Sequence, residues 1–156
     1  ISKSNKKNTG NIQMKKEELQ QIDRNEIAST ALTEEQEIYK ENIIDYYKHP
    51  RNKKELQKYT HMHRELNPLC GDDITLYLQV EKGKIKDATF IGKGCAISQA
   101  SISMLTEKIQ GMSLKEAKKL HKEDIFAMLG IPISFVRMKC ALLSLKVLHK
   151  EIHETK

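Results

Sequence analysis

The sequence has no tryptophan, few other aromatic residues and no long hydrophobic run. Phe and Tyr together make up 5% of its 156 residues, so we expect one modest core built from Ile, Leu, Val, Met and Ala. No apolar stretch approaches the roughly 20 residues that a membrane-spanning helix needs, and no hydrophobic signal core follows the basic N-terminus. These absences argue against a membrane protein and predict a soluble, cytoplasmic one. An organellar location stays open, because a chain that begins with Ile1 is expected to have a missing or processed start.

The sequence also lacks the patterns typical of a disulfide framework, a standard zinc finger or a basic nucleic-acid-binding surface. Three cysteines cannot all pair with one another, and their wide spacing argues against a secreted disulfide framework. No Cys-x-x-Cys pair is present. The net charge is +6, but acidic residues are interleaved with the lysines and no basic stripe alternates with aromatics. A nucleic-acid-binding role is therefore disfavoured, and the lysines are interpreted as a solvated surface.

The composition divides the chain into a tail and one domain. Residues 1–32 are dominated by Ser, Asn, Lys and Gln, which predicts a disordered or weakly ordered basic tail. Residues 33–156 are predicted to form a single domain. Thr33 followed three residues later by Gln36 fits a helix capping box at the start of that domain.

Hydrophobic periodicity within the domain changes from that of a helix to that of strands, and then returns to that of helices. A helix is predicted from Thr33 to His49, where the following proline ends it. Two strands joined by a tight turn follow, and several helices come after them. The predicted ranges are strands 73–80 and 85–91, and helices starting near 96 and 113 and covering about 122–129 and 134–152, with only a weak strand signal in 51–72. This order predicts an α+β fold with a small antiparallel sheet packed against helices.

Three cysteines and one aspartate carry the clearest chemical signal. Cys70, Cys95 and Cys140, with Asp72 two residues after the first, supply three thiolates and one carboxylate. This is a four-ligand set for a thiophilic metal or an iron–sulfur cluster, and its hard carboxylate suits a site that releases its cargo. The alternatives are that the cysteines pack as small hydrophobes, that Asp72 is a turn residue, or that Asp73 competes as the ligand.

The last cysteine is predicted to accept sulfur. Cys140 is expected near the start of the final helix, where the helix dipole, Arg137 and Lys139 would lower its thiol pKa.

Two histidines are an alternative source of metal ligands. His61 and His63 lie on one side of an extended segment, although a surface-loop position is the simpler interpretation.

Four short stretches carry a family resemblance. They are Tyr46-Tyr47-Lys48-His49-Pro50-Arg51-Asn52, Asn67-Pro68-Leu69-Cys70-Gly71-Asp72, Gly92-Lys93-Gly94-Cys95-Ala96-Ile97-Ser98 and Arg137-Met138-Lys139-Cys140-Ala141. The chain resembles the IscU/NifU-type iron–sulfur cluster assembly scaffolds, within them the SufU branch, over about residues 34–152. The resemblance implies a SufE/NifU-like fold. It also implies that Cys70, Asp72, Cys95 and Cys140 bind a transient [2Fe–2S] cluster or Zn²⁺.

The same resemblance implies a function. The protein would be a scaffold or sulfur carrier and not a turnover enzyme. It would accept sulfur as persulfide from a cysteine desulfurase and pass cluster or sulfur to recipient apo iron–sulfur proteins. Lys139 before the last cysteine is SufU-like, whereas the short segment between the second and third cysteines is IscU-like. Zinc-dependent sulfur acceptance without cluster assembly, and a purely structural zinc-binding module, are therefore the alternatives.

Overall fold

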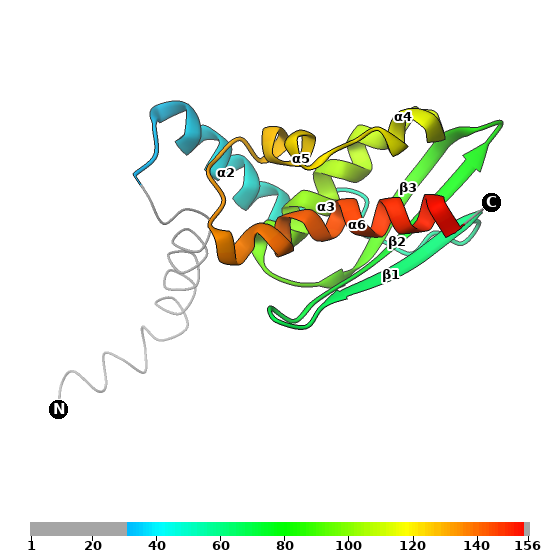
Figure 1. Cartoon of the computed structure of the whole chain (residues 1–156), viewed down its shortest axis with the longest axis horizontal. Coiled ribbons are helices and arrows are strands. Elements are labelled where there is room, and N and C mark those ends of the chain that lie inside the picture. The colour runs from blue at the N-terminus through cyan, green and yellow to red at the C-terminus, as the bar shows by residue number, and fades with distance from the viewer. Residues whose placement is uncertain (1–30, 155–156) are drawn as a thin grey trace.

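The computed structural model describes residues 31–154, so nearly all of the predicted basic tail lies outside the described residues. The described part is an antiparallel sheet with its helices gathered on one side (Figure 1). Its elements are α2 (Glu34–Lys48), β1 (His61–Asn67), β2 (Asp72–Glu81), β3 (Lys84–Lys93), α3 (Ala96–Ile109), α4 (Leu114–Lys118), α5 (Lys122–Leu129), the 3-10 turn η1 (Phe135–Arg137) and α6 (Met138–Glu154). The α+β prediction is confirmed. No helix in residues 31–154 is both long and apolar enough to cross a membrane.

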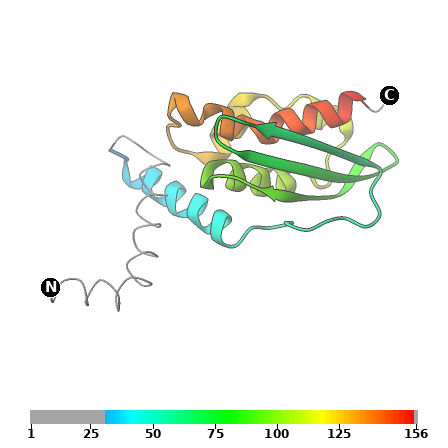
Figure 2. The same cartoon turned by 90° about the horizontal axis from the view of Figure 1, so that it is seen from below.

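The sheet has the strand order β1-β2-β3, with both neighbouring pairs antiparallel. Lys82 and Gly83 join β2 to β3, with φ angles of 53° and 75°. Two consecutive positive φ values are typical of the tight turn that matches the twist of a hairpin, and glycine adopts them without a Cβ penalty. The helices α3 and α6 pack against one face of the sheet, with α6 over β1 and β2 and α3 against β3 (Figure 2).

The central strand is buried on both faces, whereas its alternating sequence predicted a half-buried strand. Ile74, Leu76 and Leu78 face the helices and are fully buried. Tyr77, on the opposite face, is only 7% exposed. The second face is buried because the long connection from α2 to β1 runs beside the sheet (Figure 2). In this connection, the ring of Tyr59 packs edge-on against Tyr77, with 5.3 Å between the ring centroids.

The predicted helix ends are mostly confirmed. Thr33 and Gln36 form the expected capping box at the start of α2. Gly130, with φ 69°, ends α5 as predicted. The last helix differs from its prediction, because the chain first makes the short turn η1 and enters α6 only at Met138. Cys140 therefore lies in the first turn of α6.

Candidate metal centre

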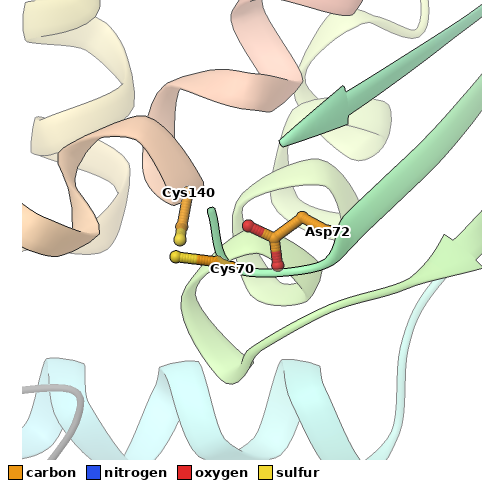
Figure 3. Close-up of side chains that lie close together, drawn as sticks. All are labelled: Cys70, Asp72 and Cys140. Atoms are coloured by element: carbon orange, nitrogen blue, oxygen red, sulfur yellow. The ribbon is translucent and has the colours of Figure 1, made fainter. Parts of the chain in front are cut away.

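Three of the four predicted ligands come together where the β1–β2 connection meets the start of α6 (Figure 3). Cys70 lies in that connection, Asp72 is the first residue of β2, and Cys140 lies in α6. One ligand atom from each lies within 4.8 Å of the other two. Gly71, between the first two, has φ 70°, a left-handed conformation that glycine adopts readily. The Cys-x-Asp spacing thus places a thiol and a carboxylate side by side.

The carboxylate of Asp72 is held by donors on both of its oxygens. Asp72 is 1% exposed. The backbone N–H of Cys95 and the hydroxyl of Ser98 each donate to its Oδ1 at 3.1 Å. The side-chain amide of Asn67 donates to its Oδ2 at 3.2 Å. These hydrogen bonds fix the orientation of the carboxylate, and Asp72 belongs to strand β2 and not to the turn before it.

Cys95 lies beside this group but is not part of it. It is the N-cap of α3, and its Sγ accepts a hydrogen bond from the backbone N–H of Ser98 at 3.5 Å. Its side chain is half-buried. The backbone N–H of Cys95 donates to Asp72. The start of α3 is therefore connected to Asp72, although the Cys95 thiol is not among the converging atoms.

Burial raises the pKa of the Cys140 thiol, so the predicted lowering of that pKa is wrong for the free thiol. The Cys140 side chain is fully buried. After burial, the further causes of the raised pKa are hydrogen bonds with Asp72 and Cys70 and the charges of Cys95 and Asp72. Lys139, on which the prediction relied, is exposed, and water screens its charge. The acidic groups next to Cys140 therefore outweigh the basic residues that flank it in the sequence.

The competing ligands are engaged elsewhere. Asp73 forms a two-point ion pair with Arg64, with contacts of 2.9 and 2.8 Å. His63 Nε2 lies 2.8 Å from Glu65 Oε1, and His61 Nδ1 lies 2.7 Å from the hydroxyl of Thr60. Within residues 31–154, the group that could hold a metal contains none of these residues.

An apolar groove of about 400 Å³ adjoins the site. One wall comes from the end of β1 and the following turn, and the other from α6. Its lining residues are Leu66, Asn67, Pro68, Leu69, Met138, Lys139, Leu142, Leu143 and Lys146. Leu69, directly before Cys70, is 77% exposed, and Leu66 is 51% exposed. This groove is not apparent from the sequence, because its apolar residues belong to segments far apart in the chain.

Asn67 and Ser98 are the other residues that sequence reasoning missed. Both belong to the stretches that carry the family resemblance, but only the fold shows that both donate to Asp72. The available signal was that each is a polar residue close in sequence to a cysteine. Polar residues near ligands are frequent in loops for other reasons, so that signal alone is weak.

The chain is similar to known proteins over most of its length. Residues 38–156 match the family model described as NifU-like N terminal domain. The chain is 36% identical over 132 residues to the zinc-dependent sulfurtransferase SufU of Bacillus subtilis, covering 74% of this chain and 89% of that protein. It is 36% identical over 131 residues to the iron-sulfur cluster assembly scaffold protein IscU of Thermotoga maritima, covering 74% and 92%.

Solved structures agree with this similarity. A crystal structure described as a candidate iron-sulfur cluster assembly scaffold protein for the SUF system, from Fervidobacterium islandicum, matches with a TM-score of 0.60 at 31% identity. The match covers 72% of this chain and 94% of that chain. The N-terminal part of a NifU-like protein from Brucella abortus, at 21% identity, has the same fold with a TM-score of 0.61, over 76% and 96% of the two chains. The predicted NifU-like fold is confirmed.

Proposed function

Because this chain belongs to the family of NifU-like N-terminal domains, we propose that it is an iron–sulfur cluster assembly scaffold. In this role it accepts sulfur from a cysteine desulfurase, binds iron or zinc, and passes cluster or sulfur to recipient apo iron–sulfur proteins. The observation that carries the proposal is the convergence of Cys70, Asp72 and Cys140 within 4.8 Å. Relatives named as a cluster assembly scaffold and as a zinc-dependent sulfurtransferase support it.

The proposed ligands are Cys70, Asp72, Cys95 and Cys140. Thiolates and a carboxylate suit zinc or iron, and four such ligands complete a tetrahedral site. A metal cation displaces thiol protons when it binds, so it would offset the cost of burying the Cys140 thiolate. Cys95, whose backbone already contacts Asp72, is the nearby thiol that would complete the set.

Asp72 is proposed to be the exchangeable ligand. Its oxygens are hard donors beside soft sulfurs, so its bond to a thiophilic cargo is the weakest of the four. The hydrogen bonds from Cys95, Ser98 and Asn67 hold the carboxylate in place without any metal. The carboxylate can therefore release the cargo without losing its other partners.

Cys140 is proposed to accept the sulfur. Because burial raises the pKa of Cys140, its thiol must first lose its proton. The resulting thiolate would attack the terminal sulfur of the desulfurase persulfide, forming a new S–S bond and releasing the desulfurase cysteine as a thiolate. Because Cys140 is fully buried, the site must open before the persulfide can reach it. Cys70 is half-buried and next to the exposed Leu69, so it is the competing acceptor on grounds of access.

A trapping experiment separates the two thiols. The protein is mixed with a desulfurase and cysteine, alkylated, and digested for peptide mass spectrometry. The added sulfur is expected on the Cys140 peptide and should be lost in Cys140→Ser. Label on Cys70 or Cys95 that persists in Cys140→Ser would mean that Cys140 is not the primary acceptor.

The groove beside the site is the proposed docking surface for the desulfurase. Its walls carry the Cys70 turn and the start of α6, so a partner seated there would lie next to both thiols. Exposed apolar side chains grouped in one place are typical of protein interaction sites. Leu69→Asp should therefore weaken desulfurase binding and slow sulfur transfer. Ile38→Asp is the matched control, because Ile38 is also exposed, at 71%, but lies on α2 outside the groove.

The alternatives are a structural zinc module and a zinc-dependent sulfur acceptor without cluster assembly. Anaerobic purification followed by analysis of iron, zinc and acid-labile sulfide distinguishes them. A scaffold supplied with ferrous iron, cysteine, desulfurase and a thiol reductant, which reduces the persulfide sulfur to sulfide, should gain iron and sulfide together. A sulfur acceptor should keep its zinc and carry persulfide alone, and a structural module should keep its zinc and take up neither.

A further inference from the structure

The side-chain amide of Asn67 joins two of the predicted ligands. Its Nδ2 donates to Asp72 Oδ2 at 3.2 Å and to Cys140 Sγ at 3.6 Å. Asn67 is 6% exposed, and both of its partners are buried. An amide NH₂ group carries two hydrogens, so one donor group serves both ligands at once.

The sheet fixes where this amide lies. Asn67 ends β1 and is paired directly with Asp72, the first residue of β2. Side chains of directly opposite residues on a strand pair lie on the same face and close together. The amide therefore sits beside the carboxylate because of strand register, and Cys140 reaches it from α6, which packs over β1.

Removing the amide would leave the ligand atoms poorly satisfied. Asp72 Oδ2 would lose the donor described for it, while Oδ1 would keep the donors from Cys95 and Ser98. Buried acceptors without donors are costly, and charged ones more so. An apolar side chain at position 67 would therefore let the carboxylate turn and would remove the donor directed at the thiol sulfur.

We propose that Asn67 is a positioning residue of the metal site. It holds the side chains of Asp72 and Cys140 in the orientation needed to bind one shared metal ion. It is not itself a ligand. The hydrogen bonds to Asp72 and Cys140 orient these two side chains and reduce the repulsion between their negative charges. This inference rests on the proposed function, because it requires that Asp72 and Cys140 bind metal.

Outer partners of metal ligands typically change metal affinity by about 10–100-fold when removed. Asn67→Ala and Asn67→Leu both delete the amide, and Leu keeps the branched shape of the side chain at a somewhat larger volume. We expect either variant to bind Zn²⁺ about 10–100-fold more weakly in a chelator competition. Co²⁺ bound in place of zinc should show altered thiolate-to-metal absorption. Asn67→Gln keeps the amide on a longer arm and should recover part of the affinity.

The matched control removes an equivalent bond elsewhere. Gln110 donates its side-chain amide to the carbonyl of Ala88 at 3.2 Å, so Gln110→Ala should leave zinc affinity and the cobalt spectrum unchanged. A double-mutant cycle adds a readout that a general loss of stability would not move. In an Asp72→Ala background, the cost of Asn67→Ala in zinc affinity should shrink, because one of the two ligands that Asn67 positions is gone.

Each outcome decides a separate claim. If the wild-type chain binds no Zn²⁺ through its cysteines, the proposed function is wrong and the role of Asn67 is overturned with it. If the wild type binds zinc and a folded Asn67→Ala or Asn67→Leu binds within twofold of it, with the same cobalt spectrum, only the positioning role is overturned. An equal cost of Asn67→Ala with and without Asp72 also overturns it. Should Asn67→Leu not fold, Asn67→Ala decides alone.

Discussion

Replacing Glu151 by glutamine should stabilise the protein, and increasingly so as the pH rises. Glu151 lies on α6 and is 2% exposed. Burial raises the pKa of its carboxyl from an ordinary 4.5 to about 9, since the charged form is disfavoured away from water. The folded protein therefore keeps a proton on Glu151 at pH values at which the unfolded chain has lost it.

The sign and size of the effect follow from this difference in pKa. Below pH 4.5 the carboxyl is protonated in both states, and the side chain costs nothing through ionisation. As the pH rises toward 9, stability falls, because unfolding lets Glu151 release its proton. The loss is about 1.4 kcal/mol for each pH unit above 4.5, or about 3 kcal/mol at pH 7. Glutamine has nearly the same shape and does not titrate, so Glu151→Gln avoids this loss.

Urea unfolding at several pH values measures the effect. The free energy of unfolding of Glu151→Gln should match that of the wild type near pH 4.5 and exceed it by about 3 kcal/mol at pH 7. Glu55→Gln is the control, because Glu55 is exposed and its replacement should change little at any pH. Parallel pH profiles for Glu151→Gln and the wild type would refute the reasoning, because they would mean that Glu151 titrates alike in both states.

Two further predictions concern Asp72 and its surroundings. Asp72→Ala should hold a reconstituted cluster longer than the wild type, because the exchangeable hard ligand is gone. Cluster decay, followed by absorbance with and without chelator, tests this prediction. Faster loss of the cluster in the variant would count against a release role for Asp72. Gly94→Ala should cost about 1–3 kcal/mol of stability and weaken zinc binding, because a Cβ at Gly94 would lie 2.3 Å from Ser98 Oγ and 2.5 Å from Asp72 Oδ1. Thermal unfolding and zinc competition measure that effect, and unchanged zinc affinity in Gly94→Ala would mean that the close approach is not needed.

Local signals predicted much of the fold. The capping box at Thr33 and the hairpin turn at Lys82 and Gly83 depend on residues within a few positions of one another. Such features are set by backbone sterics and short-range hydrogen bonds, which neighbouring residues determine. They could therefore be read from the sequence with little knowledge of the rest of the molecule.

Strand β1 could not be predicted in this way because the face it turns to α6 is polar. His63 and Glu65 lie on that face where an apolar residue would be expected. Lys146 and Lys150 of α6 reach Glu65 at 3.5 and 3.0 Å. Burial acts to raise the pKa of Glu65, but its hydrogen bonds with His63 and Lys150 and the charges of both lysines lower that pKa to about 2. The lysines of α6 help to stabilise this polar strand face, so the hydrophobic pattern of the sequence marks it only weakly.

Three of the four side chains that the sequence singled out do lie together, but their electrostatics could not be predicted. The Cys-x-Asp spacing and the position of Cys140 early in a helix gave the right neighbourhood for both thiols. The pKa of Cys140 was predicted in the wrong direction, because burial and the nearby acidic groups belong to the tertiary fold. The role of Asn67 likewise depends on the register between β1 and β2, which the weak β1 signal did not provide.

The most direct test of the four-ligand site is the metal content of the wild type and its ligand variants. The wild type, purified anaerobically, should carry one zinc or one cluster per chain, as measured by elemental and acid-labile sulfide analysis. Cys70→Ser, Cys95→Ser and Cys140→Ser should each lower that content sharply, since a tetrahedral site with a missing thiolate binds metal much more weakly. Full metal retention in all three variants would contradict the assignment.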